Sequence, residues 1–328
     1  MTDITATGHG NAPKRRLHVA KLFKTYGTVI IFLLLVAFAA TQSSAFLKEG
    51  NVMNILLQIS GVGLMSVGML FVILTGGIDL SVGSIAALGS VASALFLQHY
   101  PLYLAIPFSI GIGAICGLIS GIFISFFRLP AFVITLAMMT AARGYALIMA
   151  NGQPIMVSEN GQALTNFGTS HTFGIPNPAI VMFAVFLVAL VVLNFMRFGR
   201  LVKAIGSNKE AVRLSGIPVS FYVLMVYVIA GALAALAGVL ITARSGVGSP
   251  DVATGSELSA IAAVVIGGAS LMGGVGGAIN TFLGVLILGI IGNIMNLAGV
   301  AGYDQEVYLG VIIVIAVLIQ NASHILRR

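Results

Sequence analysis

The chain has 328 residues, of which 59% are hydrophobic and only 8% are Asp, Glu, Lys or Arg. About a quarter of the residues of a soluble globular domain are charged, so this composition excludes the soluble classes and indicates an integral membrane protein. The formal net charge of +7 does not indicate nucleic-acid binding, because the basic residues gather in a few loops between apolar segments.

A basic segment precedes the first apolar run, as in a signal peptide. We interpret this run as an uncleaved first span, because it is long for a signal sequence and similar apolar segments follow along the whole chain. The sequence therefore predicts an all-α integral membrane protein with about ten transmembrane helices. The predicted spans cover residues 26–45, 54–76, 80–98, 102–127, 130–150, 178–196, 220–241, 257–272, 278–296 and 306–320.

These spans form one transmembrane domain over residues 26–320, with a basic segment of residues 1–25 before it and a tail of residues 321–328 after it. If the N-terminus is cytoplasmic, nearly all Lys and Arg residues lie in inner loops or at the two termini. The longest predicted outer loop, residues 151–178, contains neither Lys nor Arg. We therefore predict a multi-pass membrane protein with both termini in the cytoplasm.

The junction between the second and third spans contains an isolated carboxylate, Asp79, in the sequence TGGIDLSVGSIAAL. Gly76 and Gly77 allow a sharp turn before it. Asp79 either caps a helix that begins at Leu80 or acts directly on a sugar or a proton. We favour the cap, and expect Asp79→Asn to impair chiefly assembly.

A second acidic segment, TGSELSAIAAVVIGG, begins at residue 254 and resembles the first, because Glu257 and Ser259 take the places of Asp79 and Ser81. An offset of five spans reverses orientation, so the two halves are predicted to be inverted repeats; chance similarity is the alternative. The predicted helix-junction or gating residues are Gly76, Gly77, Asp79, Ser81, Glu257 and Ser259.

Other residues inside the spans suggest helix packing or a pathway. Glycines recur every four residues at 113, 117 and 121, which predicts close approach of a neighbouring helix. Arg143 lies deep in the fifth span and needs an anionic or carbonyl partner, for which Glu257 and Asp304 are candidates. Polar groups that either line a pathway or bridge helices are Gln58, Asn293 and Asn296, and Arg143 is a further pathway candidate.

The largest predicted inner loop, residues 197–219, contains a short helix with clear end signals. Ser207 and Glu210 fit a capping box, Gly216 suits a left-handed cap, and Pro218 blocks continuation. A helix this short is marginal alone in water, which favours docking on another protein over an ordinary basic loop. We expect Ala211 and Leu214 to share one face of this helix, beside Lys209 and Arg213.

No phosphate-binding glycine loop, nucleophile elbow or metal-ligand spacing is present in the sequence. The five histidines lie at termini or in loops, so we expect no metal site. The sequence accordingly predicts a non-enzymatic subunit that binds no nucleotide, cofactor or metal of its own.

Three stretches in this order resemble the membrane permease of ribose-type ABC sugar importers. They are ILTGGIDLSVGSIAAL (73–88), AIGSNKEAVRLSGI (204–217), and a long segment that begins GSELSAIAAVVIGG and ends at residue 300. The similarity extends over essentially the whole chain from about residue 45. Branched-chain amino acid permeases are more distant relatives.

The resemblance implies a type II ABC importer fold and a homodimer in the lipid bilayer of the bacterial inner membrane. It further implies that a cytoplasmic ATPase, which binds ATP and Mg, drives this homodimer. It also implies a periplasmic sugar-binding protein as donor of a ribose-like pentose or a hexose. The loop that matches 204–217 is the ATPase-coupling segment in that family. The resemblance assigns this ATPase-coupling role to the matching residues of this chain, which are Ser207, Asn208, Lys209, Glu210, Arg213, Leu214 and Gly216. An ABC permease for another small solute, such as an amino acid, and an ion-coupled secondary transporter are the alternatives.

Overall fold

A computed structural model describes residues 14–325 of the chain. The longer helices and the two short apolar helices are α1 (Lys14–Gln42), α2 (Glu49–Leu74), α3 (Val82–Phe96), α4 (Leu102–Ser125), α5 (Ala131–Met149), α7 (Asn177–Phe195), α10 (Val219–Ser245), α11 (Ser256–Ile266), α12 (Ala278–Leu297) and α13 (Gly302–Ile325). The connecting elements are β1 (Ile155–Met156), a 3-10 turn (Glu159–Gly161), α6 (Gln162–Thr169), β2 (His171–Thr172), β3 (Ile175–Pro176), α8 (Arg197–Ser207), α9 (Lys209–Leu214) and β4 (Val247–Gly248).

Each of the ten predicted spans contains one of these helices, so the all-α fold class is confirmed. In the part of the chain that is described, six helices are long and apolar enough to cross a membrane. The predicted N-terminal segment ends at residue 25, but α1 runs without a break from Lys14 into the first span. Residues 1–13 of that segment and residues 326–328 of the predicted tail lie outside the described residues.

Two predicted spans contain only short helices. The helices α3 and α11 have 15 and 11 residues, and at 1.5 Å per residue they are shorter than a bilayer core of about 30 Å. Non-helical segments precede both of them, at residues 75–81 and 246–255. The predicted span 257–272 is too long as a helix, because α11 begins at Ser256 but ends at Ile266, and Gly268 just beyond its end has a φ of +86°. The predicted span 80–98 is longer than α3 by two residues at each end.

The helices α2 and α10 form the centre of the bundle. In the most apolar stretch of α2, 78% of the residues are buried inside the bundle, and in that of α10 the share is 56%. In α5 the corresponding share is only 17%. The predicted glycine stripe of α4 faces α10, since a Cβ at Gly121 would stand 2.8 Å from the Leu224 side chain and Gly113 and Gly117 meet the α10 backbone directly. Small residues thus let the two helices pack at backbone distance, as predicted.

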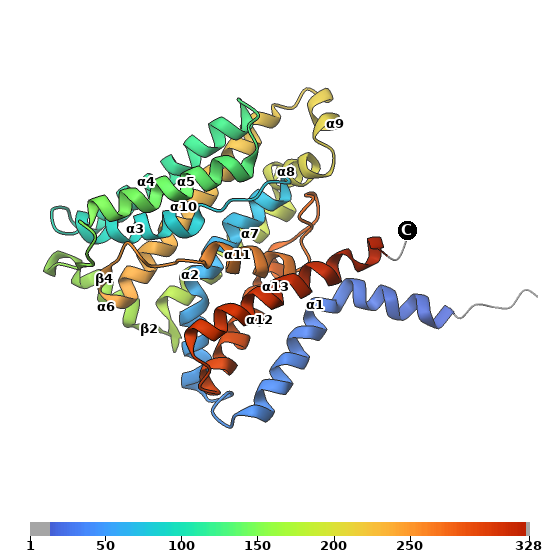
Figure 1. Cartoon of the computed structure of the whole chain (residues 1–328), viewed down its shortest axis with the longest axis horizontal. Helices are drawn as coiled ribbons and strands as arrows, with labels where there is room; N and C mark the ends of the chain where they lie inside the picture. Colours follow the sequence, from blue (N-terminus) through green and yellow to red (C-terminus); the bar gives the residue numbers. More distant parts are fainter. Residues whose placement is uncertain (1–13, 326–328) are drawn as a thin grey trace, which may run out of the picture.

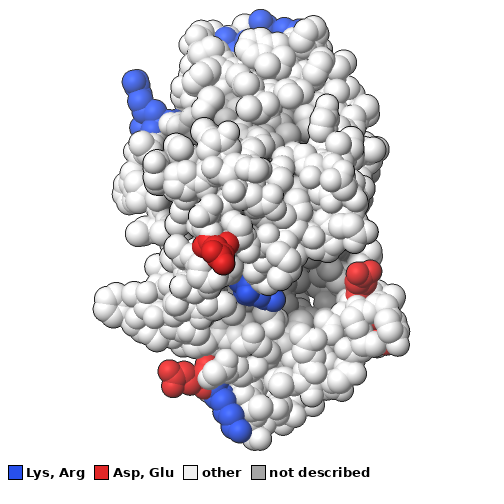
Figure 2. Space-filling model, turned by 90° about the vertical axis from the view of Figure 1, so that its left-hand side faces the viewer, with Lys and Arg blue, Asp and Glu red and all other residues white. Residues whose placement is uncertain are grey.

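The bundle has two distinct ends. The helices α8 and α9 lie at the upper right of Figure 1, and α6 and β4 lie at the lower left. At the α6 end, β1 pairs antiparallel with β4 (Ile155 opposite Gly248), and β2 pairs antiparallel with β3 (His171 opposite Pro176). Figure 2 looks onto this side of the molecule, where Lys, Arg, Asp and Glu are few and scattered. All five basic residues of the predicted inner loop, residues 197–219, lie on α8 and α9.

Candidate functional site

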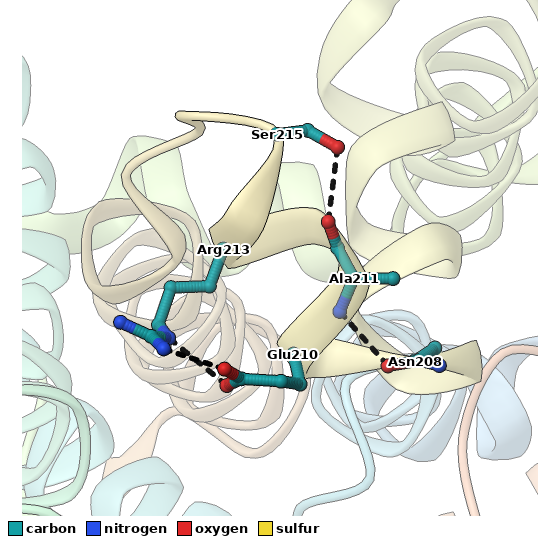
Figure 3. Close-up of polar contacts among 5 residues, drawn as sticks. All are labelled: Asn208, Glu210, Ala211, Arg213 and Ser215. Carbon is teal, nitrogen blue, oxygen red and sulfur yellow. Dashed lines mark hydrogen bonds and ion pairs between the residues drawn. The ribbon is translucent and has the colours of Figure 1, made fainter.

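The predicted coupling loop folds as two helices that meet at Asn208. Asn208 has an extended backbone (φ −157°, ψ 92°), and its Oδ1 accepts a hydrogen bond from the Ala211 amide at 2.9 Å (Figure 3). Ser207 is the last residue of α8 and does not cap α9. The predicted capping box of Ser207 and Glu210 is therefore wrong. The break between the two helices falls one residue later, at Asn208, and the Asn208 side chain is the acceptor that caps α9.

Glu210 pairs with Arg213 instead of reaching back to the start of the helix. Arg213 donates to the two carboxylate oxygens of Glu210 at 2.9 and 2.5 Å (Figure 3). This hydrogen bonding holds the pKa of Glu210 below its ordinary value, and pairing with Glu210 raises the pKa of Arg213. It is the one ion pair that the described residues form, and it lies on the exposed side of α9.

The end of α9 follows the predicted signals. Gly216 has a φ of +77°, its amide donates to the Arg213 carbonyl at 3.0 Å, and the left-handed cap is confirmed. Leu214 is 74% exposed, whereas Val212 is buried. Ala211 and Leu214 are both exposed and stand three residues apart on α9, so they share one outward face as expected, whereas Val212 contacts the bundle. An exposed leucine beside a charged pair is a surface suited to a protein partner.

The helix α8 is joined to the bundle through its last turn. A Cβ at Gly206 would overlap the Leu74 carbonyl oxygen at the end of α2. The amide of Gly274, in the loop between α11 and α12, donates to that same oxygen at 3.0 Å. Gly274 also lies against the backbone of Ser207. Three segments far apart in sequence thus meet at backbone distance directly behind α9.

The segment that follows α2 carries the buried carboxylate. The Oδ1 atom of Asp79 accepts from the Ser81 amide at 2.9 Å and from the Ser81 hydroxyl at 2.6 Å, and the side chain is fully buried. The helix α3 begins at Val82, two residues after the expected start at Leu80, so these bonds organise the turn before the helix. Gly77, two residues earlier, approaches the Tyr227 hydroxyl of α10 too closely for a side chain.

The second acidic segment lies beside the first. Glu257 is in the first turn of α11. A Cβ at Gly83, in the first turn of α3, would overlap the Glu257 carboxylate and would stand 2.6 Å from the Ala253 carbonyl oxygen. The two Leu-Ser segments therefore lie at the starts of two short helices that touch. A carboxylate at that place is favourable, because the amino end of a helix is the positive end of its dipole.

Arg143 has carbonyl partners. Its Nη1 donates to the carbonyl oxygens of Pro250 and Val252, the second at 3.0 Å. Of the two predicted kinds of partner, anionic and carbonyl, the carbonyl is the one observed, and the candidates Glu257 and Asp304 form no ion pair with Arg143. These two carbonyl oxygens belong to the non-helical segment before α11, so they form no intrahelical hydrogen bond and can accept from the guanidinium. Arg143 thereby ties α5 to the segment that leads into α11.

The polar residues proposed for a pathway separate into two groups. Asn293 is 3% exposed and exchanges hydrogen bonds with Asn51 at 3.0 and 2.9 Å, so it bridges α12 and α2. Asn296 accepts from Gln305 at 2.8 Å. Gln58 lines a cavity of about 320 Å³ between α2, α11, α12 and α13. Other polar residues of that cavity are Ser259, Gln305 and Glu306.

Several residues of these sites were missed by reasoning on the sequence. Gly206 and Gly274 carry no local signal that distinguishes them from the other glycines of the chain, which number 40. Tyr227 is one of two tyrosines in an apolar span, and its hydroxyl is buried without a hydrogen-bond partner among the described residues. Only the packing of α10 against the α2–α3 segment identifies it.

The chain is similar to known transport permeases over most of its length. A family model described as branched-chain amino acid transport system / permease component matches residues 51–319. The chain is 42% identical over 261 residues to the ribose import permease protein RbsC of Escherichia coli (strain K12), which covers 79% of each chain. It is 40% identical over 246 residues to RbsC of Bacillus subtilis (strain 168), which covers 75% of this chain and 76% of the relative.

A third relative differs in its sugar. The L-arabinose transport system permease protein AraH of Escherichia coli (strain K12) is 32% identical over 259 residues, which are 79% of this chain and 78% of the relative. No solved structure matches the chain significantly.

Proposed function

The chain belongs to the branched-chain amino acid transport system permease family, and from this premise we propose how it carries a monosaccharide across the membrane. It is the membrane permease of an ABC sugar importer, and its relatives are named for ribose and L-arabinose import. The ribose permeases share more identity with it than the arabinose permease does, which supports ribose over L-arabinose as the solute.

The energy for transport enters, in this proposal, through α8 and α9. A cytoplasmic ATPase subunit docks on the exposed side of α9, where Asn208 holds the first turn and Glu210, Arg213 and Leu214 face outward. The ATPase binds ATP and Mg, so the permease itself needs neither. Both termini are cytoplasmic in this arrangement. In Figure 1, α1 begins and α13 ends on the right-hand side of the molecule, which supports this orientation.

The observation that carries the proposal is the backbone junction of Gly206, Leu74 and Gly274. A displacement of α8 acts on α2 and on the loop before α12 without a flexible side chain between them. The end of α2 leads into Gly76, Gly77 and Asp79, and this segment leads into α3. Closely packed interiors transmit such displacements because they deform little.

The short helices α3 and α11 form the gate in this proposal. Their starts touch at Gly83 and Glu257, and Arg143 ties α5 to the segment before α11. Non-helical backbone at membrane depth is tolerated where it is buried in protein or lines a cavity, and transporters use such interrupted helices at their pathways. The inverted-repeat hypothesis gains support, since both acidic segments precede or begin a short helix.

Two further partners complete the importer. A periplasmic sugar-binding protein delivers the sugar at the α6 end, where Lys, Arg, Asp and Glu are few (Figure 2). A second copy of the chain forms the other half of the pathway. The 320 Å³ cavity that Gln58, Ser259 and Glu306 line offers amide, hydroxyl and carboxylate groups, which suit a hydroxylated solute.

The test is sugar uptake in cells that lack this chain, measured with several labelled pentoses and hexoses. We expect uptake of one pentose to be lost and to return when the gene is restored. In proteoliposomes, transport should require ATP, the ATPase subunit and the binding protein. Uptake that an ion gradient drives without ATP would identify a secondary transporter, and uptake of an amino acid alone would reject the sugar assignment.

A further inference from the structure

A basic pocket lies beside α8 and adjoins the end of the coupling segment at Gly216, away from the exposed side of α9. It has a volume of about 380 Å³, and its lining includes Arg197, Arg200, Ile217 and Tyr222. Both arginines are exposed. Arg200 donates only to the Phe195 carbonyl, at 3.2 Å. Among the described residues neither arginine forms an ion pair, so the pocket presents positive charge without an internal counter-ion.

An apolar groove runs along α7 on the same side of the bundle. It has a volume of about 590 Å³ and lies between α7, α2 and α10. Val181, Val185, Val188 and Val192 line it over most of the length of α7. Val188 is 61% exposed, so the groove is open to the surroundings of the bundle. In a membrane these surroundings are acyl chains.

The pocket and the groove are joined by three aromatic rings. The Phe198 ring lies 6.1 Å from that of Phe71, which lines the groove, and 5.7 Å from that of Tyr222, which lines the pocket. Gly199 keeps α8 close to the end of α7, because a Cβ there would overlap the Val192 carbonyl oxygen. The arginines are therefore held at the end of the groove that is nearer to α8.

We propose that the basic pocket and the apolar groove together bind one anionic phospholipid, with its phosphate between Arg197 and Arg200 and an acyl chain along α7. Charge complementarity selects this occupant, because the paired guanidiniums match a phosphate and the adjoining groove matches a hydrocarbon chain. The site lies on the proposed cytoplasmic side, where basic pockets between helices face anionic headgroups. The lipid bridges α8 to α7 and α10, which steadies the helix that carries the coupling segment.

Native mass spectrometry of the full chain, extracted from phosphatidylcholine vesicles that contain a minor fraction of phosphatidylglycerol, tests the proposal. We expect one phosphatidylglycerol to be retained per chain, and its affinity to fall about 30-fold in the double variant Arg197→Gln/Arg200→Gln. The control variant Arg128→Gln/Lys203→Gln loses the same charge outside the pocket and should retain the lipid. Size-exclusion profiles and helix content show whether each variant is folded.

Two further measurements distinguish a lipid phosphate from free phosphate, and an acyl chain in the groove from a second copy of the protein. Inorganic phosphate should not displace the lipid at concentrations where phosphatidylglycerol binds. If phosphate competes equally well, the site recognises only the phosphate group, and the proposal that the groove holds an acyl chain is overturned. Val188→Phe should weaken lipid retention without changing charge. If it changes the amount of dimer instead, a second copy covers the groove and the proposal fails. Retention that is equal for phosphatidylcholine and phosphatidylglycerol, or unchanged in the Arg197/Arg200 variant, would also overturn it.

Discussion

The α-carbon of Gly206 lies against the Leu74 carbonyl oxygen, so closely that a side chain at position 206 would overlap it. The same oxygen accepts from the Gly274 amide. Because the backbones of α8 and α2 touch here with no side chain between them, we expect a displacement of α8 to move α2.

Gly206→Ala should therefore uncouple the permease. An overpacked contact costs about 1–3 kcal/mol, which shifts a docked–undocked equilibrium of α8 by about 5- to 150-fold. We expect sugar uptake in cells to fall within that range at normal membrane abundance. Gly292→Ala on α12 is the control, since a Cβ there meets nothing within 4 Å. Full uptake by the Gly206 variant would contradict the proposed route.

Asn208 sets the start of α9, and its replacement tests the coupling segment directly. Loss of an N-cap side chain costs about 1 kcal/mol, so Asn208→Ala should lower sugar-dependent ATPase stimulation by about fivefold. Asn208→Ser supplies another good cap and should restore most of it. ATP hydrolysis by the assembled complex is the measurement. Equal activity of the two variants would show that the cap is irrelevant to coupling.

The Glu210–Arg213 pair predicts a pH dependence confined to α9. The pairing lowers the pKa of Glu210 from its ordinary value of 4.5. Its contribution to α9 is therefore fully present above pH 4.5 and is lost as the pH falls through the lowered pKa. Hydrogen exchange of residues 209–214 in the solubilised full chain should speed up over that range, after correction for intrinsic exchange. Glu210→Gln should abolish the pH dependence, and an unchanged profile in that variant would rule out the pair as its source.

Asp79 supports the turn before α3, and we expect its loss to reduce folded protein. Asp79→Ala leaves the Ser81 amide buried without its acceptor, at a cost of about 1–3 kcal/mol. The yield of monodisperse permease in detergent should fall, whereas Asp304→Ala, at an exposed position on α13, should leave it unchanged. Normal yield with abolished transport would instead make Asp79 a functional charge.

Asn51 and Asn293 form a reciprocal pair that a double-mutant cycle can isolate. Asn51→Leu leaves the Asn293 amide without its partner, and Asn293→Leu leaves the Asn51 amide with only the Phe46 carbonyl. Interhelical pairs of this kind contribute about 1–2 kcal/mol at most. The double variant should be less destabilised in thermal unfolding than the sum of the two single variants. Strict additivity would mean that the two amides act independently.

The sequence alone was enough to predict the ten helical segments and the fold class, because apolar length and loop charge are local properties that the bilayer selects directly. The acidic Leu-Ser segments and the left-handed Gly216 were also visible locally. The capping box was wrong, because Ser207 and Asn208 are adjacent good caps and packing of α8 against Leu74 decides which one starts α9.

Only the tertiary structure decided which groups meet. It brings Gly206 to Leu74, Glu257 to Gly83, and Arg143 to the carbonyls of Pro250 and Val252. Small residues permit such approaches but do not choose the partner, and the half-buried guanidinium of Arg143 can donate to any carbonyl or carboxylate within reach. The helices α3 and α11 are shorter than a full span, so non-helical backbone lies beside its neighbours inside the bundle. This arrangement determines which partner each of these groups meets.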